Sequence, residues 1–432
     1  MHNSTDAANM DLGLEGISKI EGHLDVALRV KDGKVDYVKL MINENKRFYT
    51  QAVRGKPMQG VAQLVSRICG TCSIAHLSCC IASVESAIGL VPSEQTRKLR
   101  ELVMWSLMIR DHAMHLYLFC LPDLYGKDSV LEFDSEDEKK LVASALEVKS
   151  AGNNLSKYVA GRAVHAPWPT VGGFTSFPDP SRKEEMIHQL EHARGHALEF
   201  VEIFYNCPWK FERKTTNVAL VGDNFDYLGG DLHASNGTVI SKKNFYHHLF
   251  RIVIPYSSAT GFMFEGGDYL VGALSRLNLA RHTLHPSTRR DCEKQLSRFP
   301  SQNIYDSNLA QAIEIVHCID SSIEMLQKEE FKPEPLVAPP RKEGVGIGVI
   351  EAPRGTLYYN IVINDAKVSE ANLVIPTAQN QVNMEKDLAR LVQECLDAGK
   401  DREFIQHEME KLIRAYDPCM SCATHFLKVN WK

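Results

Sequence analysis

The stretch RICGTCSIAH, Arg67 to His76, places two cysteines three residues apart, and a histidine follows them. A second pair with the same spacing stands near the other end of the chain, in DPCMSCATH, Asp417 to His425. Four thiolates form a complete ligand set for one soft metal centre. The two pairs therefore predict a shared site that brings the N-terminal and C-terminal parts of the chain together.

Spacing alone leaves other interpretations of the two pairs open. A four-cysteine zinc site is common, but its ligand pairs usually lie within tens of residues of each other. A thioredoxin-like redox pair needs a helix N-terminus beside a parallel sheet, and the sequence gives no sign of that context. Both pairs could also be ordinary buried cysteines. We favour a catalytic transition-metal site.

Length and composition limit the class of protein. The chain has 432 residues, 44% of them hydrophobic, which is enough to enclose a buried site. The formal net charge of -5 offers no basic field for nucleic acid or an anionic membrane. Arg110 and Asp111 interrupt the longest apolar region before it reaches the roughly 20 residues of a bilayer span. Without a secretory signal pattern or a disulfide framework, we expect a cytoplasmic protein.

Hydrophobic patterns predict a mainly helical chain. Residues 22–42 alternate around Asp32-Gly33 as a β-hairpin, and residues 344–376 alternate as strands around Asn364-Asp365. One helix is predicted after Ser93 as N-cap, and another after a capping box at Ser181 and Glu184. Helical periodicity predicts two more helices, in 308–326 and 384–399. The proline-rich segment 332–343 reads as a surface connection and a candidate sub-domain boundary. GVGIG, at 344–348, lacks the following helix that a nucleotide-binding loop requires.

The two cysteine motifs resemble the signatures of the large subunit of nickel-iron hydrogenases, R-x-C-G-x-C-x-x-x-H and D-P-C-x-x-C-x-x-H. The similarity covers nearly the whole chain and keeps the order of IEGH (20–23), RDH (110–112), EAPRG (351–355) and IPTAQN (375–380). It implies one domain over 1–432 with an α+β, predominantly helical fold, in which a central helical bundle with small peripheral β-sheets holds the metals. The resemblance also argues against zinc.

The resemblance assigns the metal ligands and the reaction. Cys69 and Cys419 would be terminal thiolates on nickel. Cys72 and Cys422 would bridge nickel to an iron that carries two cyanide ligands and one carbon monoxide. The implied activity is the reversible heterolytic cleavage of dihydrogen into protons and electrons. Cys419 would take the proton, and the carboxyl of Glu21 would relay it out of the site.

The resemblance also implies roles for side chains around the metals. Arg354 would lie over the open metal position and hydrogen-bond a cyanide, with Pro353 beside it among the cofactor-binding residues. Asp111 would pair with Arg354, because a buried carboxylate needs a partner. Asp417 would complete this group, Thr377 would donate to the other cyanide, and His76 would hydrogen-bond a bridging sulfur. His112 and His115 are interpreted as structural histidines.

A second ion site is implied less completely. In relatives the histidine at the His425 position binds magnesium, together with the carbonyl at the Leu373 position and a glutamate upstream of the first motif. Here Thr50 stands where many relatives carry that glutamate. The magnesium site is therefore expected to be altered, water-rich or filled by a different ion. Tyr359 stands where some relatives have a histidine, and the sequence suggests no role for it.

The implied enzyme needs partners. The chain has no further cysteine cluster suited to an iron-sulfur centre, so electrons would leave through a small iron-sulfur subunit and further electron-transfer subunits. A maturation protease commonly removes a C-terminal extension after the last motif histidine in this family. Residues 426–432 follow His425 here, so the sequence is either an uncut form or that of a member that keeps its tail.

Two other functions belong to related proteins. A hydrogen sensor would carry the same ligands, signal to a kinase and turn over slowly. A quinone-oxidoreductase subunit of the respiratory complex shares the ancestry and fold but characteristically lacks the four cysteines. Cys69, Cys72, Cys419 and Cys422 therefore argue directly against the quinone-linked function.

Overall fold

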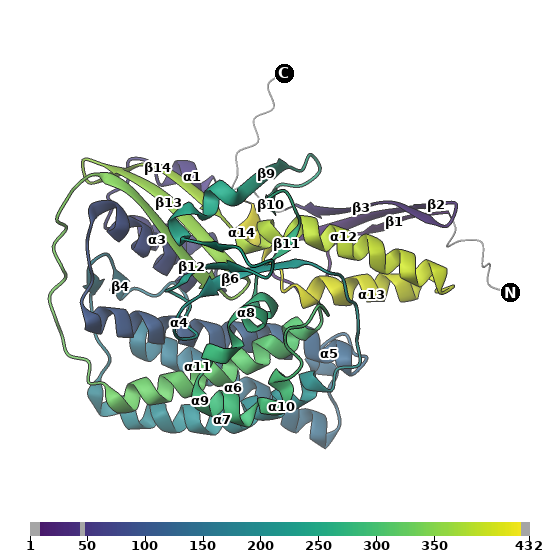
Figure 1. Cartoon of the computed structure of the whole chain (residues 1–432). Helices are drawn as coiled ribbons and strands as arrows, with labels where there is room; N and C mark the ends of the chain where they lie inside the picture. Colours follow the sequence, from purple (N-terminus) through teal and green to yellow (C-terminus); the bar gives the residue numbers. More distant parts are fainter. Residues whose placement is uncertain (1–8, 44–47, 425–432) are drawn as a thin grey trace.

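The computed structural model describes residues 9–43 and 48–424. Four long helices form a bundle on one side of the molecule (Figure 1): α4 (Glu94–Met114), α6 (Glu136–Ala160), α7 (Lys183–Tyr205) and α11 (Asp306–Lys328). The small sheets lie around it, which confirms the expected α+β, predominantly helical fold. Among the described residues, no helix has the length and apolarity needed to cross a bilayer.

Caps define where the bundle helices begin. Ser93 accepts a hydrogen bond from the Thr96 amide and caps α4, as predicted. The predicted capping box at Ser181 is wrong. Asp179 instead accepts from the Ser181 amide and caps a short 3-10 turn, and α7 begins after that turn. The capping box occurs at Ser135, which starts α6 together with Glu138.

The N-terminal sheet is antiparallel in the order β1 (Met10–Leu14), β2 (Leu24–Lys31) and β3 (Lys34–Ile42). The hairpin at Asp32-Gly33 is confirmed, and both turn residues have positive φ, at 49° and 71°. The third strand, β1, was not predicted. Helix α12 (Pro376–Asp397) packs against β3 and begins eight residues before the predicted helix, with Pro376 in its first turn.

A second antiparallel sheet supports the cysteine region. Its strands are β12 (Gly344–Ala352), β13 (Gly355–Asn364) and β14 (Lys367–Val374), and its inner face packs against α3 (Ser73–Ile88). The glycines of GVGIG make this contact. A Cβ on Gly344, Gly346 or Gly348 would lie 2.0, 2.0 or 2.3 Å from backbone oxygens of Ala87, Ser83 and Cys79, one on each successive turn of α3. The motif is therefore a helix-packing surface.

The glycine contact has a consequence for the position of the site. Helix α3 begins directly after Cys72, and β12 leads directly into Pro353 and Arg354. The strand and the helix are in contact through backbone atoms, so no intervening side chain can change its rotamer and alter their separation. This contact fixes the distance between the first cysteine motif and Arg354.

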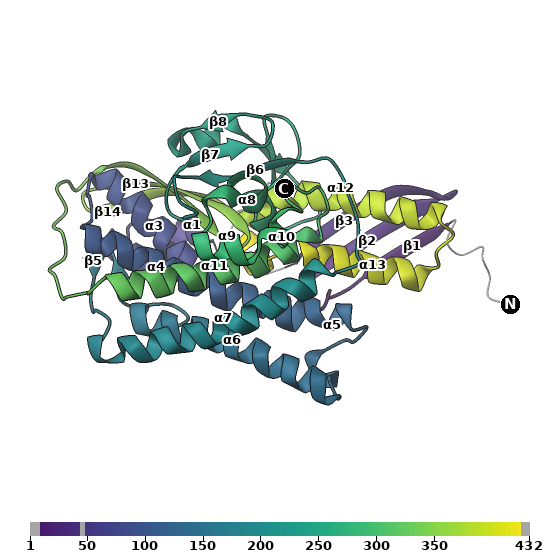
Figure 2. The ribbon, with the colours of Figure 1, turned by 60° about the horizontal axis from the view of Figure 1, so that its bottom comes forward.

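The rest of the fold covers the bundle and the second sheet. Figure 2 shows β6 (Thr216–Val221), β7 (Asp231–Ala234) and β8 (Val239–Ile240) as a layer on one side; β11 (Tyr269–Leu270) completes that sheet. The other short strands are β4 (Pro169–Thr170), β5 (Gly173–Phe174), β9 (Leu249–Val253) and β10 (Thr260–Phe264). The other helices are α1 (Tyr49–Ala52), α2 (Val61–Val65), α5 (Leu121–Leu124), α8 (Ala273–Ala280), α9 (Pro286–Asp291), α10 (Glu293–Leu296), α13 (Arg402–Ala415) and α14 (Met420–Ala423).

Residues 332–343 run between α11 and β12 along the outside of the molecule (Figure 1). They form neither helix nor strand, and most of their side chains are exposed. The predicted surface connection is confirmed, and its role as a sub-domain boundary stays a prediction.

Candidate metal centre

The structure brings the two cysteine pairs together in the interior. Cys72 caps α3 and Cys419 caps α14, so each pair sits at the start of a helix. The Sγ atoms of Cys69 and Cys419 are 3.4 Å apart, and those of Cys72 and Cys422 are 2.9 Å apart. Cys419 Sγ also lies 2.9 Å from Cys422 Sγ. All four side chains are buried, and their sulfur atoms lie within 4.8 Å of one another.

The chemistry of this cluster suits a metal cation. Burial raises the pKa of the Cys419 and Cys422 thiols, whereas hydrogen bonds from Cys419, Cys422 and Cys72 lower the pKa of Cys69. Coordination to a metal is the ordinary way to hold four buried thiolates together, because the ion supplies the missing positive charge.

A small cavity lies beside the sulfur atoms. Apolar side chains make up much of its wall, and Arg354 and Thr377 add polar groups; the lining residues are Cys72, Ala75, His76, Ala352, Arg354, Leu357, Ile375, Pro376, Thr377, Cys419 and Cys422. Predominantly apolar walls with a few hydrogen-bond donors suit small, weakly basic metal ligands better than water. Pro353 does not line this cavity. It lines the neighbouring one with Arg354 and Asp417.

Glu21 reaches the cluster from the N-terminal segment. The Cys419 thiol donates to Glu21 Oε2 over 3.0 Å, and the Ser421 amide donates to the same oxygen over 3.1 Å. The Glu21 carbonyl accepts from the Met420 amide, so backbone pairing holds the two segments together. Burial, followed by the negative charge on Cys69, raises the pKa of the Glu21 carboxyl above its ordinary value. The side chain is only partly buried and spans from Cys419 toward the surface.

Arg354 lies beside the cluster, in the wall of the small cavity, and donates three hydrogen bonds. Its Nη1 donates to Asp111 Oδ2 over 2.7 Å, its Nη2 to Asp417 Oδ1 over 2.9 Å, and its Nε to the Asp417 carbonyl over 3.1 Å. Gln311 donates to the second Asp417 oxygen. The predicted pairing of Asp111 with Arg354 is confirmed. Asp417 also has a positive φ of 48°, which turns the chain into the second cysteine motif.

Arg276 was not among the residues predicted from the sequence. It is buried and donates to the carbonyls of Ala352 and Pro353, directly before Arg354. Glu314 accepts two hydrogen bonds from its guanidinium, and Glu351 accepts a third. This charge network fixes the backbone that carries Arg354. No local sequence motif predicts this network, because Arg276 and Glu351 are 75 residues apart in the chain.

Tyr359 gains a role in the structure. Its hydroxyl is 2.8 Å from His76 Nδ1, and His76 Nε2 is 3.4 Å from Cys422 Sγ. Burial lowers the pKa of His76 to about 4, so its imidazole is neutral at physiological pH. Tyr359 therefore orients a neutral histidine toward one of the cysteines that would bridge the metals. The expected contact between His76 and that sulfur is present in the structure.

The remaining predicted residues have different outcomes. Thr377 Oγ1 accepts from the Cys419 amide over 3.0 Å, which leaves its hydroxyl proton free to point into the cavity. Leu373 is buried in edge strand β14, and Thr50 lies on α1, which packs against that strand. His425 and residues 426–432 lie outside the described residues. The altered ion site therefore stays a prediction.

His112 and His115 are confirmed as hydrogen-bonded structural histidines. His112 Nε2 is 2.8 Å from Glu314 Oε2. His115 lies 2.6 Å from Gln311 Oε1 and 2.7 Å from the Arg414 carbonyl. Arg110, which precedes Asp111 on α4, donates to the Thr71 carbonyl inside the first cysteine motif over 2.7 Å. This contact was not anticipated and anchors the loop between Cys69 and Cys72.

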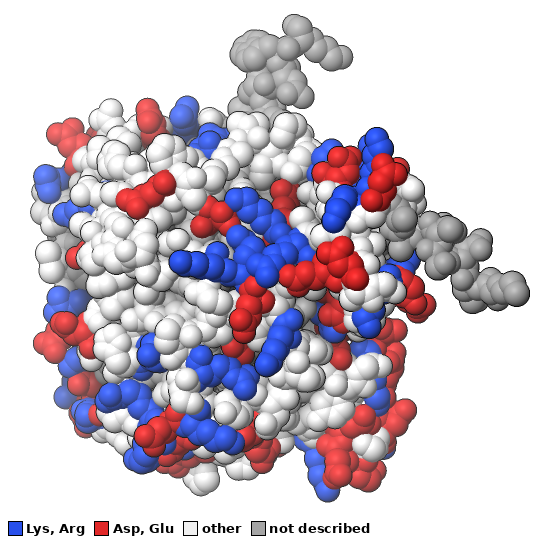
Figure 3. Space-filling view, turned by 45° about the vertical axis from the view of Figure 1, so that its right-hand side comes forward, with Lys and Arg blue, Asp and Glu red and all other residues white. Residues whose placement is uncertain are grey.

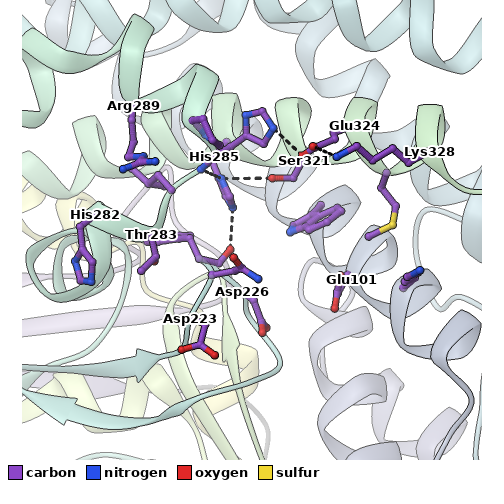
Figure 4. Close-up of a pocket in the computed structure, with 18 of the residues that line it drawn as sticks. Glu101, Asp223, Asp226, His282, Thr283, His285, Arg289, Ser321, Glu324 and Lys328 are labelled. Atoms are coloured by element: carbon purple, nitrogen blue, oxygen red, sulfur yellow. Dashed lines mark hydrogen bonds and ion pairs between the residues drawn. The ribbon is translucent and has the colours of Figure 1, made fainter.

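A cavity of about 580 Å³ lies elsewhere, between α4, α11 and the loop before α9 (Figure 4). None of its lining residues belongs to the four-cysteine cluster. Burial raises the pKa of Glu101, which points into this cavity, to about 7, and the charge of Asp226 adds to the shift. His285 and Glu324 form an ion pair on the opposite wall.

Surface charge is mixed. On the face in Figure 3, lysine and arginine side chains gather near the centre, but aspartate and glutamate side chains lie directly beside them. Lys386 and Arg213, for example, both pair with Asp268. This face carries no uniform positive field of the kind that nucleic-acid binding needs.

Comparisons with known proteins agree with the geometry. The family model described as nickel-dependent hydrogenase matches residues 47–166 and 264–425, well over half of the chain. Sulfhydrogenase 1 subunit alpha of Pyrococcus furiosus is 31% identical over 97% of this chain and 99% of its own length. Sulfhydrogenase 2 subunit alpha of the same organism is 30% identical over 97% of this chain and 100% of its own length.

The fold has a close counterpart among solved structures. The crystal structure of an NAD+-reducing [NiFe]-hydrogenase in the H2-reduced state superimposes with a TM-score of 0.88. The match covers 97% of this chain and 100% of that chain at 22% sequence identity. At that identity the comparison establishes the fold alone.

Proposed function

The chain belongs to the nickel-dependent hydrogenase family, and on that premise we propose that it is the catalytic large subunit of a nickel-iron hydrogenase. Membership of the family makes the protein a hydrogenase, an oxidoreductase that depends on nickel. The finer proposal is that it cleaves dihydrogen reversibly and heterolytically. The observation that carries it is the buried cluster of Cys69, Cys72, Cys419 and Cys422, with the Glu21 carboxyl hydrogen-bonded to it and Arg354 in the wall of the adjoining cavity.

The four cysteines would hold the cofactor. In this proposal Cys69 and Cys419 bind nickel alone, and Cys72 and Cys422 bind nickel and an iron with two cyanides and one carbon monoxide. When bound, this centre supplies the splitting of dihydrogen and the storage of its electrons. The apolar cavity beside the thiols supports the proposal, because small diatomic ligands need space and few competing polar groups.

Glu21 carries the proton away from the site. Cys419 Sγ holds the proton first, and Glu21 Oε2 lies within hydrogen-bond distance of it. Transfer requires acceptor and donor to have similar proton affinities. Burial brings the Glu21 carboxyl closer to a thiol in this respect by raising its pKa. Because Glu21 is only partly buried, it can pass the proton toward solvent.

Arg354 acts as the fixed positive charge of the site. Arg354 is among the residues that line the cavity, while two carboxylates and a carbonyl hold its guanidinium in one orientation. A preorganised donor of this kind polarises a substrate without any cost of reorganisation during the reaction. Thr377 supplies a second donor, and His76 tunes the basicity of Cys422.

Electrons must leave through partner subunits. In the part of the chain that the structure describes, the four cysteines are the only cluster of thiols that could hold metal. The relatives are named as alpha subunits, which supports assembly with other chains. We propose a small iron-sulfur subunit and further electron-transfer subunits as partners, in the cytoplasm, and a maturation protease that acts near His425.

Metal analysis and infrared spectroscopy of the purified complex test the proposal. We expect nickel and iron in the chain, with stretching bands of cyanide and carbon monoxide. Cys422→Ser should lose both the metals and the bands. Cys292→Ala should keep both, because this cysteine is buried but distant from the cluster. The absence of nickel and of these bands from the unmodified complex would refute the proposed active site.

A further inference from the structure

A second group of metal-ligating side chains lies on the outside of the helical bundle. Glu147 projects from α6, and His192 and His196 project from α7. His192 Nδ1 is 3.1 Å from Glu147 Oε2, and His196 Nε2 is 3.0 Å from the same oxygen. One ligand atom from each residue lies within 4.8 Å of the other two.

The two helices preorganise this group. His192 and His196 are four residues apart, so they point from the same face of α7 on successive turns. Helix α6 packs along α7 and places Glu147 between the two rings. A groove beside the group runs between the helices, where Asn154 donates to Gln189 across the gap. The ligands therefore come from two rigid elements rather than from a loop.

The distances match metal coordination. Zinc binds imidazole nitrogen and carboxylate oxygen at roughly 2.0–2.2 Å, so neighbouring ligands of a tetrahedral ion lie roughly 3.3 Å apart. Both nitrogen-to-oxygen distances in the group are close to this value. The other nitrogen of His196, Nδ1, lies 3.5 Å from Oε2 of Glu199. A carboxylate behind a ligating histidine is the usual arrangement that orients the ring and raises its basicity.

We propose that Glu147, His192 and His196 form a second metal site, which binds a divalent transition-metal ion such as Zn²⁺ with the fourth position open to water. Two imidazoles and one carboxylate suit borderline ions, whereas Mg²⁺ and Ca²⁺ prefer all-oxygen ligands. The site fastens α6 to α7. It is independent of the buried cysteine cluster, and it does not rest on the proposed hydrogenase function.

The alternative for these residues is a simple ion pair. In that alternative, one N–H of each imidazole donates to the Glu147 carboxylate, and no ion is bound. The two alternatives differ in their response to zinc, because only the metal site binds the ion through all three side chains.

Zinc titration of the loaded enzyme complex tests the site. The buried cluster must be full, since empty thiols would also take zinc. After removal of surface metal by a chelator, isothermal titration with Zn²⁺ alone should reveal one site on this chain with micromolar or tighter affinity. His196→Ala and Glu147→Gln should each weaken binding at least tenfold. His188→Ala is the matched control, because this exposed histidine lies one turn earlier on α7 and outside the group.

A crystal of the zinc-soaked complex supplies the second measurement. Anomalous scattering at the zinc edge should place the ion between Glu147, His192 and His196, and dihydrogen oxidation should be unchanged in all three variants. Zinc bound elsewhere, equal binding by the parent and His196→Ala, or loss of binding in His188→Ala alone would each overturn the proposal. So would the absence of micromolar binding in the parent complex.

Discussion

The carboxyl groups beside the cysteine cluster have two different electrostatic surroundings, which we call the Arg354 side and the Glu21 side. On one side, Asp111 and Asp417 both pair with the guanidinium of Arg354, deep in the interior. On the other side, the Glu21 carboxyl accepts hydrogen bonds from the Cys419 thiol and from Ser421, and it forms no ion pair within the residues that the structure describes. The carboxylates of the first side neutralise a permanent charge. The carboxyl of the second side is pushed by burial toward its protonated form.

In the proposed mechanism this difference separates two tasks of the site. A group that polarises substrate must keep its charge and position, and the three hydrogen bonds that Arg354 donates achieve both. A group that relays protons must change its charge during turnover, so a strong ion pair would disable it. The fixed charges and the proposed proton relay are therefore separate residues around the same cluster.

Glu21→Gln should have the largest effect, because it removes the titratable group and keeps its shape. We expect the rate of dihydrogen oxidation to fall roughly 10²–10⁴-fold, the usual contribution of a positioned acid or base. The metals and the scission of dihydrogen and deuterium at the centre should remain, while exchange with solvent protons should be lost. Turnover, isotope exchange and metal content measure these quantities.

Glu15→Gln is the matched control for that change. Glu15 is exposed in the same N-terminal region, so its variant should behave like the parent. Full turnover in Glu21→Gln would show that protons leave by another route, and it would remove the contrast between the two sides.

Arg354→Lys tests the fixed-charge side. Lysine keeps the charge, but it cannot reproduce the three directed hydrogen bonds to Asp111 and Asp417. We expect the rate to fall about 10²–10³-fold, as for the loss of one preorganised donor. Unlike Glu21→Gln, this variant should also lose the scission of dihydrogen itself.

Arg390→Lys provides the comparison for Arg354→Lys, because Arg390 forms a half-exposed ion pair with Glu394 on α12 and lies over the Phe211 ring, away from the cluster. Its activity should match that of the parent. If Arg354→Lys keeps normal scission and loses only solvent exchange, the assignment of separate tasks to the two sides is wrong.

Gly346→Ala tests the support of the Arg354 side. The added methyl would lie 2.0 Å from the Ser83 carbonyl and 2.2 Å from the Ala87 amide, and backbone atoms cannot swing away. We expect a loss of about 3 kcal/mol in the free energy of unfolding, at the upper end of overpacking costs. Thermal unfolding and the yield of the metal-loaded complex report this loss.

Gly13→Ala is the control for the strand glycine. Gly13 lies in β1 with no heavy atom within 4 Å of its added Cβ, so the change should be nearly neutral. Equal stability of the two variants would mean that β12 is not held against α3 by backbone contact.

Glu101 tests how burial alters the pKa of a carboxyl group that has no thiolate beside it. Its pKa of about 7 is raised mainly by burial, and the folded state therefore holds its proton more tightly than the unfolded chain, whose value is 4.5. Its contribution to stability is greatest below pH 4.5 and falls as the pH rises to about 7. Because the Glu101 side chain is only partly buried, screening by solvent limits this loss to about 1–2 kcal/mol.

Glu101→Gln should remove that dependence. The thermal midpoints of the variant and the parent are measured in parallel at each pH. The midpoint of the variant minus that of the parent should be larger at pH 8 than at pH 5. A constant difference between the two proteins across this range would contradict a burial-raised pKa at Glu101. It would also weaken the same explanation for Glu21.

Much of the site could be predicted from the sequence because its signals are local. A pair of cysteines three residues apart is legible in either motif, and the resemblance supplied Glu21, Asp111, Arg354, Thr377 and Asp417 by their positions within short motifs. The structure brings these residues to one place. The residues that position the site residues could not be predicted from the sequence. Tyr359 and His76 are 283 residues apart, and Arg276 acts on Pro353 from 77 residues away.

The sequence by itself indicated the four cysteines that come together, the family and the helical character, since motifs and periodicity are properties of neighbouring residues. Only the tertiary structure decided which carboxyl group meets a cation and which is merely buried. It also showed that the glycines of GVGIG, in a segment predicted as strand, form the surface that seats β12 on α3. The physical reason is that pKa values, ion pairs and backbone contacts depend on atoms a few ångströms away in space, which are usually far away in the chain.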